Sequence, residues 1–228
     1  MGKNLKYQEA CVYTMSFIRY PGGKQRLVNQ ILPFIPALKQ NSNFVEPFVG
    51  GAAIYFALSP SKAVLADINP TLIQLYKSLK ERPLQVWNYY RKFPSNKKAY
   101  YKIRDGRVHK SEAYKAARTL YLNRTCFKGM WRENSEGKFN VGYGGQDRRW
   151  VINRKSLIEV SKQLKKAKLL QSDFAETIRK CNKNDFIFLD PPYKPGEKEL
   201  KHSHYVYSKF SYEDYKRLSE TLSEATRK

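Results

Sequence analysis

The chain has 228 residues, and its 43 Lys and Arg against 20 Asp and Glu give a formal net charge of +23. The three cysteines are too few and too scattered for a disulfide framework, so we expect a cytoplasmic protein. No segment reaches about 18 consecutive apolar residues, so we expect no membrane span. Such a positive charge is typical of proteins that bind a polyanion, most often nucleic acid, the alternative being a charge that only keeps the protein soluble.

The first half of the chain alternates short apolar runs with helical stretches. "RYPGGK" (19–24) predicts a turn before the helical run 25–36. The run 43–49 predicts a strand that ends in glycines, and an alanine-rich helical stretch follows it. The run 63–68 predicts a second strand that ends in an acid.

The second half predicts two more strands, over 167–173 and 185–190. Strands separated by helices indicate an α/β fold with a parallel, doubly wound sheet. About a hundred residues separate the second strand from the third, which is far more than one crossover needs. This spacing predicts a catalytic domain formed by residues 1–70 and 166–228, with an inserted module over 71–165. The insert starts with an amphipathic helical run that Pro83 interrupts.

The ends of the first two strands predict a nucleoside site. Glu46 and Gly50 lie where the first strand turns into a helix, and glycine there lets a ligand approach the backbone. Asp67 ends the second strand, where an acid accepts hydrogen bonds from ribose hydroxyls. Neither G-x-G-x-x-G nor a phosphate-binding loop is present. The ligand we expect therefore has a ribose and no pyrophosphate.

The run "FIFLDPPY" (186–193) predicts the reaction centre. Asp190 ends a strand, and Pro191 and Pro192 fix the backbone and offer acceptors only. One carboxylate and the Pro191 carbonyl can accept both hydrogens of an exocyclic amine, and Tyr193 offers a flat face for stacking. Two such acceptors would free the nitrogen lone pair for attack on a methyl donor. The alternative is a strand that merely ends at a proline turn.

Several motifs taken together resemble the Dam-type adenine-N6 DNA methyltransferases over residues 16 to about 222. The resemblance is carried by "YPGGK" (20–24), "FVEPFVGGA" (44–52), "LADIN" (65–69), "YLNRTCFKGMWREN" (121–134), "GKFNV" (137–141), "SDF" (172–174) and "DPPY" (190–193). It implies a Rossmann-like methyltransferase sheet with a mainly helical target-recognition insert. It also implies S-adenosylmethionine as cofactor, duplex DNA as partner, and a flipped adenine as substrate.

Carried over position by position, the resemblance assigns two sets of residues. The catalytic set is Asp190, Pro191, Pro192 and Tyr193. The cofactor set is Tyr20, Gly22, Gly23, Lys24, Glu46, Phe48, Gly50, Asp67, Ile68, Asp173, Phe174 and Asp190. Within this set, Gly22 to Lys24 match a turn near the methionine end of the cofactor, and Asp173 with Phe174 match the pair at its adenine ring.

In the insert the resemblance assigns DNA contacts to Asn123, Arg124, Phe127, Lys128, Met130 and Arg132. Phe127 matches an aromatic residue that wedges into the base stack, and a bulky ring can hold an unstacked step open. Arg132 matches a residue that reads guanine, and arginine is the main reader of guanine edges. Lys128 departs from the usual Asn. GATC is the first recognition sequence to expect. Phe127 and Met130 could instead form the core of the insert, and for Trp131 we expect the core.

The C-terminal stretch carries one further prediction and the main alternative. Ser211 and Asp214 have capping-box spacing and predict a helix. Relatives usually continue with further strands, so we expect the fourth strand to form an uncovered sheet edge here. His202 and His204 form an H-x-H pair, but we expect no metal. The alternatives to an active enzyme are a truncated DNA-binding remnant and a methyltransferase on RNA or on protein glutamine. A restriction–modification or a solitary role, in a bacterium or phage, stays open.

Overall fold

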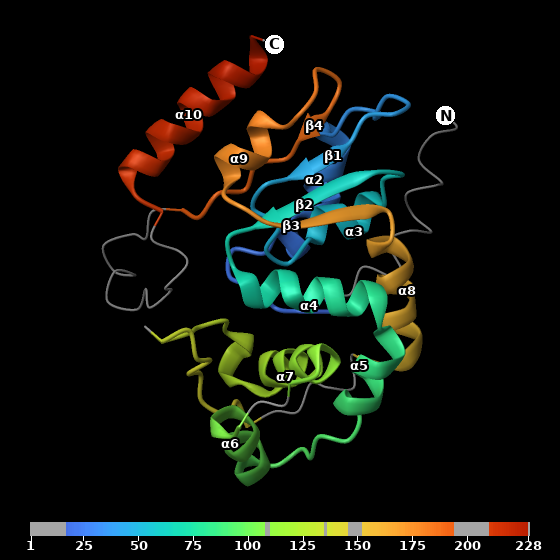
Figure 1. Cartoon of the computed structure of the whole chain (residues 1–228), viewed down its shortest axis with the longest axis vertical. Helices are drawn as coiled ribbons and strands as arrows, with labels where there is room; N and C mark the ends of the chain where they lie inside the picture. The colour runs from blue at the N-terminus through green and yellow to red at the C-terminus, as the bar shows by residue number, and fades with distance from the viewer. Residues whose placement is uncertain (1–16, 108–109, 135, 146–151, 194–209, 228) are drawn as a thin grey trace.

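The computed structural model describes residues 17–107, 110–134, 136–145, 152–193 and 210–227, and all statements below concern these residues. They form an α/β fold around a parallel sheet (Figure 1). The strands are β1 (Phe44–Glu46), β2 (Ala63–Asp67), β3 (Ala167–Gln171) and β4 (Phe186–Ile187). The helices are η2 (Lys24–Arg26), α2 (Val28–Ile31), η3 (Leu32–Phe34), α3 (Ala53–Leu58), α4 (Pro70–Glu81), α5 (Pro83–Tyr90), α6 (Lys97–Asp105), α7 (Glu112–Thr125), η4 (Phe127–Gly129), α8 (Arg154–Leu164), α9 (Phe174–Arg179) and α10 (Tyr212–Thr226).

The sheet has the order β3-β2-β1-β4, with every neighbouring pair parallel. Phe44 of β1 lies opposite Ala63 on one side and Phe186 on the other. The chain therefore moves away from β1 toward β3 and then returns to the far side of β1. This reversal places a topological switch point next to β1, where open α/β sheets bind their ligands.

Helices cover both faces of this sheet. In Figure 1, α9 and α10 lie above it and α4 lies below it. The lower face belongs to the main hydrophobic core, which continues into the insert and includes Leu72, Tyr76 and Tyr121. The upper face holds a smaller cluster in which Phe174, Ile178 and Leu218 are buried. The predicted α/β class is confirmed.

Most local predictions match the observed elements. Pro83 separates α4 from α5, since a proline suits the first position of a helix and interrupts a preceding one. Ser211 and Asp214 form the capping box of α10. The run 25–36 is instead divided among η2, α2 and η3. Pro33 lies in η3, directly after α2 ends.

The fourth strand is shorter than predicted, and its surroundings correct one expectation. Ladder bonding extends to Phe188, whose N–H donates to the Val45 carbonyl at 2.9 Å, and the Pro-Pro step follows soon after. Among the described strands β4 pairs with β1 alone, so its outer hydrogen-bonding edge is open. Its side chains are not uncovered, however, because Ile187 and Leu189 pack in the upper cluster and are half-buried.

The predicted boundary of the insert at 71–165 stays a prediction, and the packing adds detail to it. The first and last helices of that stretch, α4 and α8, are joined to each other and to the sheet. Ser161 donates to the Lys80 carbonyl at 2.8 Å, and Lys80 Nζ donates to the Ala167 carbonyl at 2.9 Å. Helices α5, α6 and α7 form the layer farther from the sheet (Figure 1). In the described part of the chain no helix is long and apolar enough to cross a membrane.

Candidate active site

Three carboxylates meet at the carboxyl edge of the sheet. Glu46 is the last residue of β1, Asp67 is the last residue of β2, and Asp190 follows β4. Parallel strands bring these ends to one edge because all of them run in the same direction. Glu46 and Asp190 lie close enough to influence each other electrostatically, and they flank the switch point beside β1.

The turn after β1 is held in a conformation that leaves no room for a side chain. Gly50 has φ of +43°, and a Cβ at this position would lie 3.1 Å from Tyr20 Cδ1. The Tyr76 hydroxyl donates to the Gly50 carbonyl at 2.6 Å. Glycine is required here for conformation and for the close approach of the Tyr20 ring. Tyr20 and Gly50 thus form one wall of the candidate site.

Asp67 fixes the same turn from the next strand. Its Oδ2 accepts from Gly50 N at 3.0 Å and its Oδ1 accepts from Asn69 N at 3.0 Å. Burial raises the pKa of Asp67, and these backbone hydrogen bonds lower it in part. A carboxylate has further lone pairs, so ribose hydroxyls could still bind here. The adjacent Ile68 is 49% exposed, which leaves an apolar side chain free to contact a ligand.

Glu46 is the least satisfied charged group at this edge. Its side chain is buried, and its Oε2 has no hydrogen-bond partner in the described residues. Burial raises the pKa of Glu46 well above its usual value, and the nearby Asp190 adds to the shift. A buried, unpaired carboxyl is costly unless it gains a partner. The group that would satisfy it is a hydrogen-bond donor, best a cationic one such as an ammonium.

Lys24 and Tyr193 both contact Asp190. Lys24 Nζ lies 2.6 Å and 2.7 Å from the two carboxylate oxygens, and the Tyr193 hydroxyl donates to Oδ1 at 3.0 Å. Lys24 Nζ also donates to the Gly22 carbonyl at 2.9 Å. Burial lowers the pKa of Lys24, but hydrogen bonds to Asp190 and Tyr193 outweigh it, so the net shift is upward. The Tyr193 side chain stays 65% exposed and can stack on a base.

Helix α10 covers Asp173 and Phe174, the two residues predicted to bind an adenine ring. Arg217 of α10 donates to both oxygens of Asp173, at 2.9 Å and 3.0 Å. Its guanidinium lies 4.3 Å from the ring centroid of Phe174, whose ring also stacks on Phe48 at 5.2 Å. The two aromatic rings and Asp173 are therefore together, as expected. Arg217 was not predicted, because only the docking of α10 on α9 brings it there.

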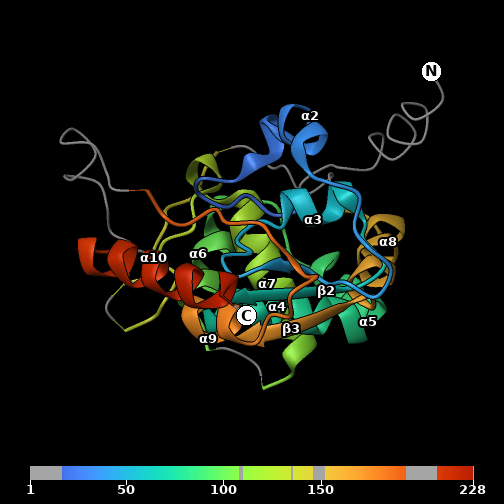
Figure 2. The ribbon, with the colours of Figure 1, turned by 90° about the horizontal axis from the view of Figure 1, so that it is seen from above.

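Helix α10 also holds the loop that follows β4. The Tyr215 hydroxyl donates to the Pro192 carbonyl at 2.6 Å, and Tyr215 packs edge-on against Phe210 at 4.8 Å. Figure 2 shows α10 running alongside α9 at the side of the sheet. Pro191 and Pro192 are half-buried. One helix therefore contacts both the predicted adenine pair and the predicted catalytic loop.

The predicted DNA-reading loop follows α7. Phe127 is 49% exposed and Lys128 is exposed with φ of 53°, whereas Met130 packs against the main core. Arg132 Nε donates to Asn140 Oδ1 at 2.7 Å, and its Nη2 donates to the Asn140 carbonyl at 3.1 Å. These contacts brace one edge of the guanidinium and leave its Nη1 end for another acceptor. Asn140 is a supporting residue that local sequence patterns did not reveal.

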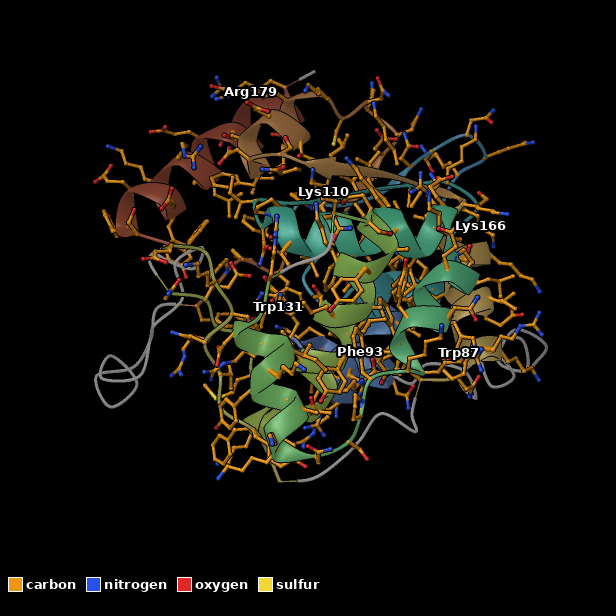
Figure 3. The ribbon with its side chains drawn as sticks, turned by 60° about the horizontal axis from the view of Figure 1, so that its bottom comes forward. Trp87, Phe93, Lys110, Trp131, Lys166 and Arg179 are labelled. Atoms are coloured by element: carbon orange, nitrogen blue, oxygen red, sulfur yellow. The ribbon has the colours of Figure 1, made fainter. Side chains whose placement is uncertain are left out.

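Burial corrects the assignment of Asn123 and Arg124 to DNA. Asn123 is 0% exposed and Arg124 is 6% exposed, so neither side chain can reach a duplex in this structure. Both side chains bond to backbone carbonyls of residues 17–19 instead. Trp131 is buried, as expected. Figure 3 shows it well inside the outline of the molecule, whereas Arg179 lies at the margin of the view.

Metal binding receives no support from the described ranges, where no group of three or more His, Cys, Asp or Glu could hold an ion. The H-x-H pair of His202 and His204 lies outside the described residues.

Comparison with known proteins gives consistent matches. A family model described as D12 class N6 adenine-specific DNA methyltransferase matches residues 20–228. "Type II methyltransferase M1.LlaDCHI" of Lactococcus lactis subsp. cremoris is 34% identical over 220 residues, covering 91% of this chain and 76% of the relative. "DNA N-6-adenine-methyltransferase" of Escherichia phage P1 is 30% identical over 99% of this chain and 30% of the relative. "DNA adenine methylase" of Vibrio cholerae serotype O1 is 29% identical over 93% of this chain and 77% of the relative. The family resemblance seen in the motifs is confirmed.

Proposed function

Because the chain belongs to the D12 class N6 adenine-specific DNA methyltransferase family, we propose that it methylates N6 of an adenine flipped out of duplex DNA, with S-adenosylmethionine as cofactor. The observation that carries the proposal is the carboxyl edge of the sheet, where Asp190 and the exposed Tyr193 lie near Glu46, whose Oε2 has no partner in the described residues. Acting on DNA, the protein would work in the cytoplasm of a bacterial or phage-infected cell.

The proposed cofactor site uses the residues around the β1 turn. When bound, S-adenosylmethionine supplies an electrophilic methyl group. Glu46 would pair with the cationic methionine end, and Asp67 would accept from the ribose hydroxyls. Asp173 and Phe174 would hold the adenine ring, with Arg217 fixing the Asp173 carboxylate. The buried Glu46 carboxyl, whose Oε2 has no partner in the described residues, supports this orientation, because a cation there removes a cost already present in the protein.

In the proposed reaction, the target amine lies between Asp190 and the Pro191 carbonyl. The two acceptors would hold its hydrogens and turn its lone pair toward the methyl group, while Tyr193 stacks on the flipped base. As the nitrogen gains the methyl group, the sulfur would keep the electrons of the broken carbon–sulfur bond, and Asp190 would accept the proton that the amine loses. In this structure both Asp190 oxygens contact Lys24. A carboxylate has about four acceptor sites, so the amine would share the Asp190 carboxylate with Lys24 or displace Lys24 from one oxygen. Extrusion costs a few kcal/mol, and the exposed Phe127 would fill the gap.

A direct test is the transfer of labelled methyl groups from S-adenosylmethionine to duplex DNA from a strain without adenine methylation. Nucleoside analysis should recover the label as N6-methyladenine, and mapping of the modified sites should start with GATC. Label on cytosine, RNA or protein would contradict the proposal. DNA binding without any transfer would favour the alternative, a DNA-binding remnant.

We expect Arg132→Ala to weaken binding to the recognised site by about 1–3 kcal/mol, with a far smaller loss on scrambled DNA. The reason is that the Asn140-braced guanidinium would present its Nη1 end to a guanine edge. Affinities on both duplexes across a salt series measure the effect.

Lys62→Ala is the matched control, because Lys62 precedes β2 at the opposite edge of the sheet and is exposed. It should leave the ratio of the two affinities unchanged. If Arg132→Ala weakened both duplexes equally and flattened the salt dependence, Arg132 would be a phosphate contact.

A further inference from the structure

The insert grips a short segment near the start of the described chain. The Asn123 side chain makes two hydrogen bonds to the Arg19 backbone: its Oδ1 accepts from Arg19 N at 2.8 Å, and its Nδ2 donates to Arg19 O at 2.7 Å. Asn123 is 0% exposed, so its side of these bonds is shielded from water, while Arg19 is half-buried. A buried amide that bonds both the N–H and the carbonyl of one residue defines the position of that residue's backbone closely.

Three further contacts to the same segment come from the end of α7 and the loop that follows it. Arg124 Nε donates to the Phe17 carbonyl at 2.9 Å. The Trp131 and Tyr20 rings lie 5.4 Å apart between centroids. Gly129 has φ of +65°, and a Cβ there would overlap the Arg19 side chain. We call residues 17–20 the tie segment, because residues 123–131 hold it from more than one side.

The tie segment leads directly into the candidate active site. The Tyr20 ring packs on Gly50, and the Tyr20 carbonyl accepts from Gly23 N at 3.1 Å. One residue later, Lys24 makes its ion pair with Asp190 at 2.6 Å. The exposed Phe127 and the half-buried Arg132 lie in or next to residues 123–131, which hold the tie segment. One continuous set of contacts therefore joins the predicted DNA-reading loop to the turn after β1 and to the Asp190 carboxylate.

If the proposed reaction occurs, binding of the target amine at Asp190 changes the end of this set of contacts, and we take the two situations as two arrangements. In the observed arrangement Lys24 contacts both Asp190 oxygens. In the reactive arrangement one of those oxygens accepts from the target amine. A ligand that favours the second arrangement changes the equilibrium at every site that the arrangement affects. Energetic coupling between two sites requires such a two-state element.

We infer that Asn123 is a positioning residue that couples DNA binding in the insert to cofactor binding at the sheet, acting through the tie segment. This inference rests on the proposed function. DNA bound to the loop at 127–132 would favour the position that the tie segment takes in the reactive arrangement. The cofactor would bind the protein more tightly when the tie segment has that position. The coupling must be reciprocal, so the cofactor would tighten DNA by the same factor.

The test measures the dissociation constant of S-adenosylhomocysteine by calorimetry, with and without saturating sheared DNA from a strain lacking adenine methylation. In the wild-type chain we expect DNA to tighten S-adenosylhomocysteine by about fivefold or more. In Asn123→Ala this ratio should fall to about one, although each ligand alone still binds. A wild-type ratio of about one, or an unchanged ratio in Asn123→Ala, would overturn the inference.

Ser161→Ala is the matched control, because Ser161 is also a buried side chain that donates to a backbone carbonyl, in α8 away from the tie segment. It should lower the melting temperature and keep the coupling ratio; loss of the ratio there would show general loosening and overturn the inference.

Gly129→Ala provides a second perturbation if Asn123→Ala does not fold. It should lower the ratio by pressing on Arg19, and an unchanged ratio in that variant would count against the inference. If the wild-type chain bound neither S-adenosylhomocysteine nor DNA, the proposed function itself would have failed. If both bound without coupling, only the inference would have failed.

Discussion

Asp190→Ala should reduce methyl transfer by about 10²–10⁴-fold while leaving DNA affinity nearly unchanged, because it removes an acceptor that holds the reacting amine. The variant also leaves Lys24 without its carboxylate partner. We therefore expect the pKa of Lys24 to fall, since burial then acts without the opposing ion pair. Single-turnover transfer of labelled methyl groups, measured beside DNA affinity, separates the loss of chemistry from the loss of binding.

Asp185→Ala is the matched control for this prediction. Asp185 lies at the amino end of β4, where it accepts from Asn43 N at 2.8 Å and from Asn182 N at 2.9 Å. Its removal should lower the stability of the fold, and turnover per folded molecule should stay near the wild-type value. Wild-type turnover in Asp190→Ala would overturn the catalytic assignment. An equal loss of turnover in both variants would indicate a structural effect on β4 instead.

Glu46→Gln should stabilise the cofactor-free protein and weaken its cofactor binding. Burial keeps Glu46 protonated in the folded chain at pH values where the unfolded chain has already released the proton. The folded state then binds more protons, so the stability of the wild-type chain falls as pH rises above the unfolded pKa, until the folded pKa is passed. Glutamine stays neutral and avoids this loss. The advantage of the variant should therefore grow with pH over that window.

The cofactor effect has the opposite sign. Glutamine cannot offer a charged acceptor to the methionine end, so we expect S-adenosylmethionine to bind the variant about 1.5–3 kcal/mol more weakly. Melting temperatures of both proteins across a pH series from about pH 5 to about pH 9, with and without cofactor, test both parts. The assignment of Glu46 would be wrong if the variant bound the cofactor as tightly as the wild-type chain does. The stability argument would fail if the variant gained no stability as pH rises.

Elements with strong local signals were predictable from the sequence alone. The apolar runs that became β1 and β2 needed no partner to be recognised, because a buried parallel strand is mostly apolar along its length. The edge strand β3 was recognisable from its apolar residues although it exposes Lys168 and Gln171. The α4–α5 break at Pro83 and the start of α10 at Ser211 were set by proline geometry and side-chain capping, which involve only neighbouring residues. Family membership likewise followed from ordered motifs.

Only the tertiary structure decided which groups contact each other across the site. Lys24 and Asp190 are 166 positions apart, and Asp173 and Arg217 are 44 apart, so no local pattern could pair them. Asn123 was assigned to the DNA surface from the resemblance of its motif, which does not tell which way a side chain faces. Helix α7 instead lies within the insert, where the backbone of residues 17–19 satisfies the polar side chains of Asn123 and Arg124. The types of residue in a motif determined its chemistry, but packing decided whether each side chain faces substrate or supports another residue.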